Sequence, residues 1–271
     1  MGLFKKKHGR SPFMSDVHQR TLHKNLEFTA TEQYKLLRTN LEFTIPEGTV
    51  CPVIGVTSSI RGEGKSTTAV NLSYVLAEKG SKVLLIDGDL RIPSVAKKMG
   101  IPASPGLTDM LMGKGTHQEC AAKSEQLDTW YIMPAGEIPP NPSELLGSKR
   151  MEATLEALRQ EFDYIIVDLP PVNIVSDALS ISSLITGMVV VIREEYTEKK
   201  ELEHCFRLLK LSNVNVFGCV MNESKAGSGS YNRYRRYRYY RYYRYYYKHG
   251  YYEYKSHDKE NKKDKNKEEK K

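Results

Sequence analysis

The residues with the clearest chemical meaning form a glycine-rich segment, SSIRGEGKST, at positions 58–67. Gly62 and Gly64 allow backbone conformations that bring N–H groups close to an anion. A helix that begins near Gly64 points the positive end of its dipole at the same place. Lys65 can then bridge β- and γ-phosphate oxygens, and the Ser66 hydroxyl can join a Mg²⁺ ion. The segment therefore predicts a site for the phosphates of a nucleotide.

The expected nucleotide contacts cover most of this loop and include one distant residue. They are Ser59, Arg61, Gly62, Glu63, Gly64, Lys65, Ser66, Thr67 and Asn222. Ser59 stands where the general pattern G-x-x-x-x-G-K-S has its first glycine. An apolar strand before the loop, a helix after it and two acidic strand ends favour a phosphate site over a glycine-rich turn without function.

Two other apolar runs end in aspartates, LLIDGDLR and YIIVDLPP. Asp168, at the end of the second run, can hold a magnesium ion through water. Asp87 and Asp89 are two residues apart at the end of the first, so both should point into one crevice, and with Arg91 nearby at least one should stay ionised. This pair offers a base for a hydroxyl nucleophile and a further metal ligand. The alternatives are that Asp87 and Asp89 cap the next helix, and that Asp168 belongs to a simple turn.

The segment from Tyr231 to Tyr254, YNRYRRYRYYRYYRYYYKHGYYEY, holds 13 of the chain's 18 tyrosines, with six arginines between them. Three uses are open: the tyrosines accept phosphate, the segment binds nucleic acid by stacking and charge, or it lies on an anionic membrane. A flexible tail of about 30 residues has a root-mean-square reach of about 30 Å, enough to bring a tyrosine to a nucleotide site. Reach therefore favours phosphate acceptors, which would be Tyr231, Tyr234, Tyr237, Tyr239, Tyr240, Tyr242, Tyr243, Tyr245, Tyr246, Tyr247, Tyr251, Tyr252 and Tyr254.

The net charge of +8 over 271 residues is concentrated in the tail. Residues 231–271 carry 15 basic and 6 acidic side chains, which leaves 26 basic and 27 acidic side chains elsewhere. The rest of the chain therefore has no charge-based reason to bind nucleic acid. The four cysteines form no C-x-x-C pair, which argues against a zinc or redox site. Cys51 and Cys219 lie in apolar runs and are expected to be buried, as fits a reducing cytoplasm.

The apolar pattern predicts alternating strands and helices, and hence an α/β fold of the P-loop NTPase kind. We expect a mainly parallel sheet with helices on both faces and a disordered, tyrosine-rich C-terminal tail. The expected strands are 53–57, 82–87, 130–134, 164–168, 188–193 and 216–221, and the expected helices are 31–43, 66–79, 107–112, 149–162, 176–185 and 197–211. The chain divides into a flexible basic segment 1–30, a nucleotide-binding domain 31–224, and a linker, tyrosine cluster and charged tail 225–271. No run approaches the roughly 20 apolar residues that span a bilayer.

The three motifs and the tyrosine cluster together resemble the cytoplasmic bacterial tyrosine kinases (BY-kinases) of the capsular and exopolysaccharide type. SSIRGEGKST resembles their Walker A motif, LLIDGDLR their Walker A′ and YIIVDLPP their Walker B. The resemblance implies that Lys65 and Ser66 bind ATP and Mg²⁺ and that Asp87 is a metal ligand and the base for the tyrosine. It also implies that Asp89 assists Asp87 and that Asp168 acts on the metal. Arg61 stands where many relatives have a proline.

The resemblance further implies an ATP-dependent autokinase that phosphorylates its own tyrosine cluster and governs polysaccharide synthesis or export. It implies a cytoplasmic protein that a membrane-anchored adaptor of the polysaccharide co-polymerase type activates and recruits to the inner face of the membrane. A cognate tyrosine phosphatase is a further expected partner, and nucleic acid is not expected.

The family also uses an E-x-x-R-x-x-R helix for ring-like self-association. Each phosphate adds a charge of about −1.5 to −2 to the basic tail, so phosphorylation is expected to dismantle such an oligomer. Here the pattern reads Glu32, Lys35 and Arg38, and the alternative is a solvated helix face with ion pairs. The rival function is a ParA/MinD-type switch ATPase, which shares the fold. Its loop typically carries an additional lysine where this chain has Ile60, and it has no use for the tail tyrosines.

Overall fold

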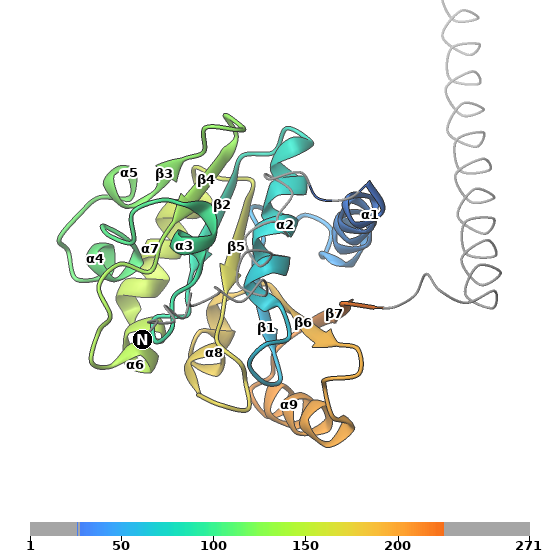
Figure 1. Ribbon diagram of the computed structural model, residues 1–271. Coiled ribbons are helices and arrows are strands. Elements are labelled where there is room, and N and C mark those ends of the chain that lie inside the picture. Colours follow the sequence, from blue (N-terminus) through green and yellow to red (C-terminus); the bar gives the residue numbers. More distant parts are fainter. Residues whose placement is uncertain (1–25, 27, 225–271) are drawn as a thin grey trace, which may run out of the picture. The chain divides into compact units, whose positions relative to one another are not determined.

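One β-sheet runs through the part of the chain that the computed structural model describes, which is residue 26 and residues 28–224. The strands follow the order β3-β4-β2-β5-β1-β6-β7 (Figure 1). The parallel strands are β1 (Val53–Ser58), β2 (Val83–Asp87), β4 (Trp130–Met133), β5 (Tyr164–Asp168), β6 (Gly187–Arg193) and β7 (Val216–Asn222). β3 (Ala122–Lys123) pairs with β4 in the antiparallel direction. The predicted acceptor tyrosines Tyr231 to Tyr254 lie outside the described residues.

Helices cover both faces of this sheet, as the sequence predicts. One face packs against α2 (Lys65–Glu78), with α1 (Phe28–Thr44) outside it (Figure 1) and α3 (Val95–Met99) beside it. The other packs against α4 (Leu107–Leu111), α5 (His117–Cys120), α6 (Pro142–Leu146), α7 (Lys149–Arg159), α8 (Asp177–Ser180) and α9 (Lys199–Leu211). None of the helices in the described residues is long and apolar enough to cross a membrane.

The central strands form because their side chains are buried on both faces. Every residue of β1 and β2 is buried. Along β1, Val53 joins the core under α7 and α9, whereas Ile54 and Val56 join the core under α2. Apolar side chains on both faces are typical of a parallel sheet covered by helices. The predicted fold is therefore confirmed. Because the central strands are parallel, the loops that follow them lie at their common carboxyl end.

The predicted helix 176–185 is not one continuous helix. The structure has a short α8, then the single 3₁₀ turn η4 (Ser182–Leu184), and then extended backbone at Ile185. Serines at 176, 180, 182 and 183 compete with the helix for backbone hydrogen bonds, and the Ser180 hydroxyl does bond the Ser176 carbonyl. The helices α3, α5 and α6 were not predicted, because four or five residues seldom show a helical period, although the equally short α4 was predicted from its amphipathic pattern.

The prediction for the cysteines is half correct. Cys51 is buried, but Cys219 is exposed. Cys219 lies on β7, which is an edge strand of the sheet and of which no residue is buried. An apolar run in an edge strand does not imply burial, since only one side of the strand is paired.

Candidate active site

The glycine-rich segment forms the loop between β1 and α2, at the carboxyl end of the central strand. Gly62 and Gly64 have φ angles of 84° and 95°, which L side chains rarely adopt. A Cβ atom at Gly64 would also lie 1.9 Å from the Nδ2 atom of Asn222. Gly64 precedes the first residue of α2, and no side chain caps this end of the helix. The first N–H groups of α2 are therefore available to an anion.

Three of the predicted residues meet at the mouth of this loop. The Nζ atom of Lys65 lies 2.9 Å from Oδ2 of Asp89 and 3.4 Å from Oδ1 of Asp168. β2 and β5 are neighbours, and their register puts Asp87 directly beside Asp168. The structure therefore brings Lys65 and the three aspartates of the two acidic strand ends into one cluster.

The carboxylates of this cluster are buried and crowded. Asp87 and Asp168 are fully buried. Burial, followed by the charge of Asp168, raises the pKa of Asp87 to about 7. Burial also raises the pKa of Asp168, although Lys65 opposes it. The pKa of Lys65 is raised as well, since the charges of Asp168 and Asp89 outweigh the effect of its burial.

This cluster fits a divalent cation. Oδ2 of Asp168 is buried and accepts no hydrogen bond from the described residues, so it is free to face a cation. The Ser66 hydroxyl lies close enough to the Asp168 carboxylate to lower its pKa. No cluster of three or more His, Cys, Asp or Glu able to hold a metal occurs in the described part of the chain. Mg²⁺ does not require one, because it is usually held by one or two carboxylates together with water and phosphate.

Asp87 and Asp89 also shape the loop that follows β2. Oδ2 of Asp87 accepts hydrogen bonds from the N–H groups of Ser94 and Val95, both at 2.9 Å, at the start of α3. Oδ1 of Asp89 accepts from the N–H of Ile92 at 3.1 Å. The helix-capping alternative therefore holds for Oδ2 of Asp87. Oδ2 of Asp89 instead pairs with Lys65.

Arg91 acts on Asp89 through its charge, as expected, but its ion pair is with another residue. The guanidinium of Arg91 donates to both carboxylate oxygens of Asp177 on α8, at 2.8 and 2.9 Å. The cation that pairs with Asp89 is Lys65. Arg91 instead ties the loop after β2 to α8.

Glu63, predicted as a nucleotide contact, points its side chain away from the loop mouth. Its buried carboxylate accepts hydrogen bonds from the N–H of Ile60 at 2.8 Å and from the Ser59 hydroxyl at 2.9 Å. It also accepts one from the hydroxyl of Thr197. Glu63 and Ser59 therefore brace the loop from inside, and their backbone remains the part that can face phosphate.

Residues at and just after the end of β6 brace the loop from outside, and the sequence alone did not predict them. The Tyr196 hydroxyl donates to the Arg61 carbonyl at 3.1 Å, and the Arg193 guanidinium donates to the Gly62 carbonyl at 3.3 Å. The same guanidinium lies over the Tyr196 ring, 5.0 Å from its centroid. The one available signal was the position of Arg193, which ends an apolar strand at the edge where ligands bind in such sheets.

Asn222 reaches the loop from the end of β7. Its Nδ2 atom donates to the Glu63 carbonyl at 3.0 Å. Asn222 therefore contacts the backbone of the loop, and its contact with a nucleotide stays a prediction.

The predicted interface residues lie on α1. Nζ of Lys35 is 3.2 Å from Oε1 of Glu32, and both side chains are more than a third exposed. Nη1 of Arg38 donates to the Val75 carbonyl of α2 at 2.6 Å. Arg38 therefore fixes α1 on α2 of its own chain, while Glu32 and Lys35 remain at the surface.

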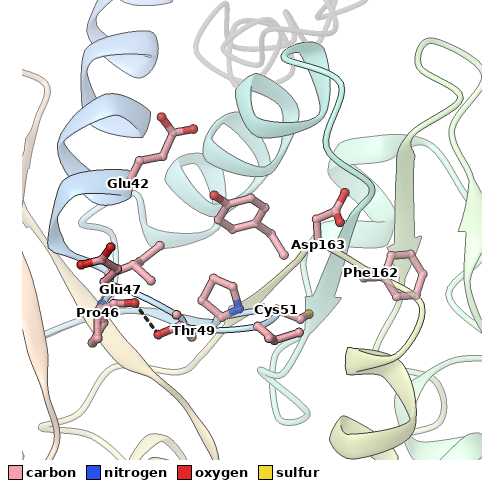
Figure 2. Close-up of a pocket in the computed structure, with 12 residues that line it drawn as sticks. Glu42, Pro46, Glu47, Thr49, Cys51, Phe162 and Asp163 are labelled. Carbon is pink, nitrogen blue, oxygen red and sulfur yellow. Dashed lines mark hydrogen bonds between the residues drawn. The ribbon is translucent and has the colours of Figure 1, made fainter. Parts of the chain in front are cut away.

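A separate pocket opens at the opposite end of the strands, near the start of β1 and β5 (Figure 2). Its acidic residues are Glu42, Glu47 and Asp163. Glu42 pairs with Lys79 at 2.8 Å, and Asp163 accepts a hydrogen bond from the N–H of Lys82 at 2.7 Å. The pocket lies away from the loop and its acidic lining is unsuited to phosphate.

The AAA domain family matches residues 52–212. Tyrosine-protein kinase YwqD of Bacillus subtilis is 38% identical over 197 residues, which cover 72% of this chain and 81% of the relative. Tyrosine-protein kinase CpsD of Streptococcus pneumoniae is 36% identical over 74% of this chain and 88% of the relative. The putative tyrosine-protein kinase CapB of Staphylococcus aureus is 30% identical over the same shares.

Solved structures agree with these matches. The chimerical protein CapA2B2 superposes with a TM-score of 0.71 at 32% identity, covering 75% of this chain and 88% of that one. The kinase domain of the Escherichia coli tyrosine kinase ETK gives 0.66 at 29% identity, covering 74% and 79%. The septum site-determining protein MinD of Pyrococcus horikoshii gives 0.55 at 23% identity, covering 66% and 72%, which shows a shared fold alone.

Proposed function

The chain belongs to the bacterial tyrosine-protein kinases, and we propose that it uses ATP and Mg²⁺ to phosphorylate the tyrosines of its own C-terminal cluster. The observation that carries this proposal is the meeting of Lys65 with Asp87, Asp89 and Asp168 at the start of α2. A lysine held between carboxylates, beside free helix N–H groups, suits a site that receives phosphate and a metal together.

The proposed roles follow from these positions. The N–H groups at the start of α2 and the ammonium of Lys65 bind the phosphates. Ser66, Asp87 and Asp168 would hold Mg²⁺, which would offset the negative charge of the phosphates. Asp89 holds Lys65 at 2.9 Å before the nucleotide arrives.

In the transfer step, the tyrosine oxygen forms a bond to the γ-phosphorus as the bond from that phosphorus to the β–γ bridging oxygen breaks. Asp87 accepts the hydroxyl proton, with Asp89 assisting. A carboxyl group whose pKa is raised toward 7 is better matched to this task than an ordinary aspartate. ADP leaves, and phosphotyrosine remains on the chain.

The tail supports this choice of substrate by its composition. Thirteen tyrosines among six arginines offer many acceptors, and a tether raises the effective concentration of acceptors to the order of millimolar. Following the family, we further propose that the protein regulates capsular or exopolysaccharide synthesis or export. A membrane-anchored adaptor of the polysaccharide co-polymerase type would activate it and recruit it to the inner face of the cell membrane, and a cognate tyrosine phosphatase would reset it.

We also propose a ring-like homo-oligomer that phosphorylation dismantles. Glu32 and Lys35 are the exposed residues of the predicted interface, and Arg38 stabilises the helix that presents them. Each phosphate would add a charge of about −1.5 to −2 to the basic tail, so that about five would neutralise it.

Intact mass spectrometry after incubation with Mg²⁺ and ATP tests the proposal. A kinase gains mass in steps of one phosphate. The Lys65→Met variant serves as the control and should gain none. Hydrolysis of ATP with no change in mass would identify a MinD-like switch ATPase instead.

A further inference from the structure

The short helix α3 connects the loop after β2 to the start of α2. At its beginning, the N–H groups of Ser94 and Val95 bind the carboxylate of Asp87. Toward its end, Nζ of Lys98 donates to the Thr67 hydroxyl at 3.3 Å. Thr67 is in the first turn of α2 and follows Ser66 directly. One turn of helix, anchored on a proposed metal ligand, therefore carries a lysine to the proposed phosphate site.

The ammonium of Lys98 differs from that of Lys65 in its partners. Lys65 is paired with the carboxylates of Asp89 and Asp168. Lys98 is half-buried and, among the described residues, forms no ion pair with a carboxylate within 4.0 Å, so the neutral Thr67 hydroxyl is its hydrogen-bond partner. Burial lowers the pKa of Lys98, although the charge of Asp168 acts in the opposite direction. A half-buried cation without a counter-ion is unfavourable unless an anion binds beside it.

We propose that Lys98 is a second phosphate-binding lysine of the nucleotide site and contacts a phosphate oxygen on the Thr67 side of the start of α2. This inference rests on the proposed ATP site. The first N–H groups of α2 and Lys65 bind the phosphates from the loop, and Lys98 approaches from the neighbouring helix. Because no carboxylate of the described residues pairs with Lys98, its ammonium can bind the nucleotide without breaking an ion pair.

The competing explanation is structural: Lys98 would only hold α3 against α2 through Thr67. Lys97 provides a matched control, because it lies on the same helix, carries the same charge and is exposed. Glutamine at position 98 separates the two explanations, since it can still donate to Thr67 but has no charge.

The test is calorimetric titration of the full-length variants with ADP in the presence of Mg²⁺. We expect Lys98→Met and Lys98→Gln to bind ADP about tenfold more weakly than the wild type, as for the loss of a charged hydrogen bond. Lys97→Met should stay within about twofold of the wild type, and Lys98→Arg should recover most of the affinity. In kinase assays, Lys98→Met should raise the KM for ATP more than it lowers kcat.

The outcomes separate this inference from the proposed function. A wild type that does not bind ADP overturns the ATP site itself. Binding that is lost in Lys65→Met but intact in both Lys98→Met and Lys98→Gln overturns only the role of Lys98. Intact binding in Lys98→Gln with loss in Lys98→Met identifies the structural explanation, and equal losses in the Lys97 and Lys98 variants would show a nonspecific effect of charge. If Lys98→Met melts early without ligand, the comparison of Lys98→Gln with Lys98→Arg decides alone.

Discussion

The side-chain amide of Asn222 donates a hydrogen bond to the backbone carbonyl of Glu63, 159 residues earlier, at 3.0 Å. The end of β7 thus holds the glycine-rich loop between β1 and α2. Gly64 is required at this point, since any Cβ atom there would meet the Asn222 amide. The predicted nucleotide contact at 222 is therefore first a support for the loop.

We predict that Asn222→Ala raises the KM for ATP by about five- to tenfold with a smaller effect on kcat, because one hydrogen bond that positions the loop is lost. Steady-state kinetics with ATP measures both constants. Asn215→Ala is the control, because Asn215 precedes the start of β7 and bonds Thr186 at 3.4 Å. Equal kinetics in the two variants would contradict a role of Asn222 at the loop.

Lys65→Met and Asp87→Asn should each reduce tail phosphorylation by about a hundredfold or more, because each removes a charge placed at the reacting phosphates. Neither should unfold the protein, since Asn keeps an oxygen for the start of α3 and the Lys65 side chain lies at the mouth of the loop, where methionine has a similar length. Phosphotyrosine detection together with circular dichroism measures both effects. Near-normal phosphotyrosine in either variant would refute the assignment of the site.

The stability of the nucleotide-free protein should depend on pH through Asp87. Its pKa rises from 3.8 to about 7 through burial and the charge of Asp168, so the folded state binds this proton more tightly than the unfolded state. The resulting stabilisation is complete below about pH 3.8 and is lost as the pH rises through about 7.

Asp87→Asn has no such proton to lose. Its Tm without metal should therefore exceed that of the wild type, and the difference should grow from pH 5 to pH 8. Each kcal/mol of unfolding free energy that the wild type loses over this range corresponds to about 2–4 °C. Thermal melts in a chelator measure this difference. Asp128→Asn, at an exposed surface site, should show no such growth, and a constant difference for Asp87→Asn would contradict the raised pKa.

The two parts of the predicted interface should respond differently to mutation. Glu32→Ala with Lys35→Ala should shift the unphosphorylated protein toward monomer with little change in Tm, because both side chains are exposed. Arg38→Ala should lower the Tm by about 2–4 °C through the lost bond to Val75. Analytical ultracentrifugation and thermal melts separate the effects. An unchanged sedimentation profile in the double variant would show that Glu32 and Lys35 form a solvated helix face and not an interface.

Replacement of the thirteen tail tyrosines by phenylalanine should keep the oligomer intact in the presence of ATP, because phenylalanine has no hydroxyl to phosphorylate. The wild type should dissociate as phosphates accumulate, most sharply beyond about five per chain. Added salt should reduce the difference, since exposed charges are screened beyond about 8–10 Å. Light scattering during phosphorylation measures this, and a mass that never depends on the phosphate count would exclude the charge mechanism.

The sequence predicts much of the fold because its information is local. Apolar runs such as β5 (Tyr164–Asp168) are continuous, helices such as α9 (Lys199–Leu211) have a clear period, and Gly62 to Ser66 form a recognisable motif. Short helices often fail this test: α3 and α4 both have five residues, and only α4 has a recognisable amphipathic pattern. The edge position of β7 is also invisible in its composition, and for this reason Cys219 was expected to be buried.

By itself, the sequence determined that this chain has a glycine-rich loop between a strand and a helix, acidic strand ends and a row of tyrosines. Only the tertiary structure decided which of these residues meet. The pairing of β2 with β5 sets Asp87 beside Asp168, and the folding of α3 onto α2 brings Lys98 to Thr67. The choice of Asp177 as the partner of Arg91 is likewise tertiary. The physical reason is that motifs depend on neighbours along the chain, whereas a site depends on distances in space between side chains that strand order and packing bring together.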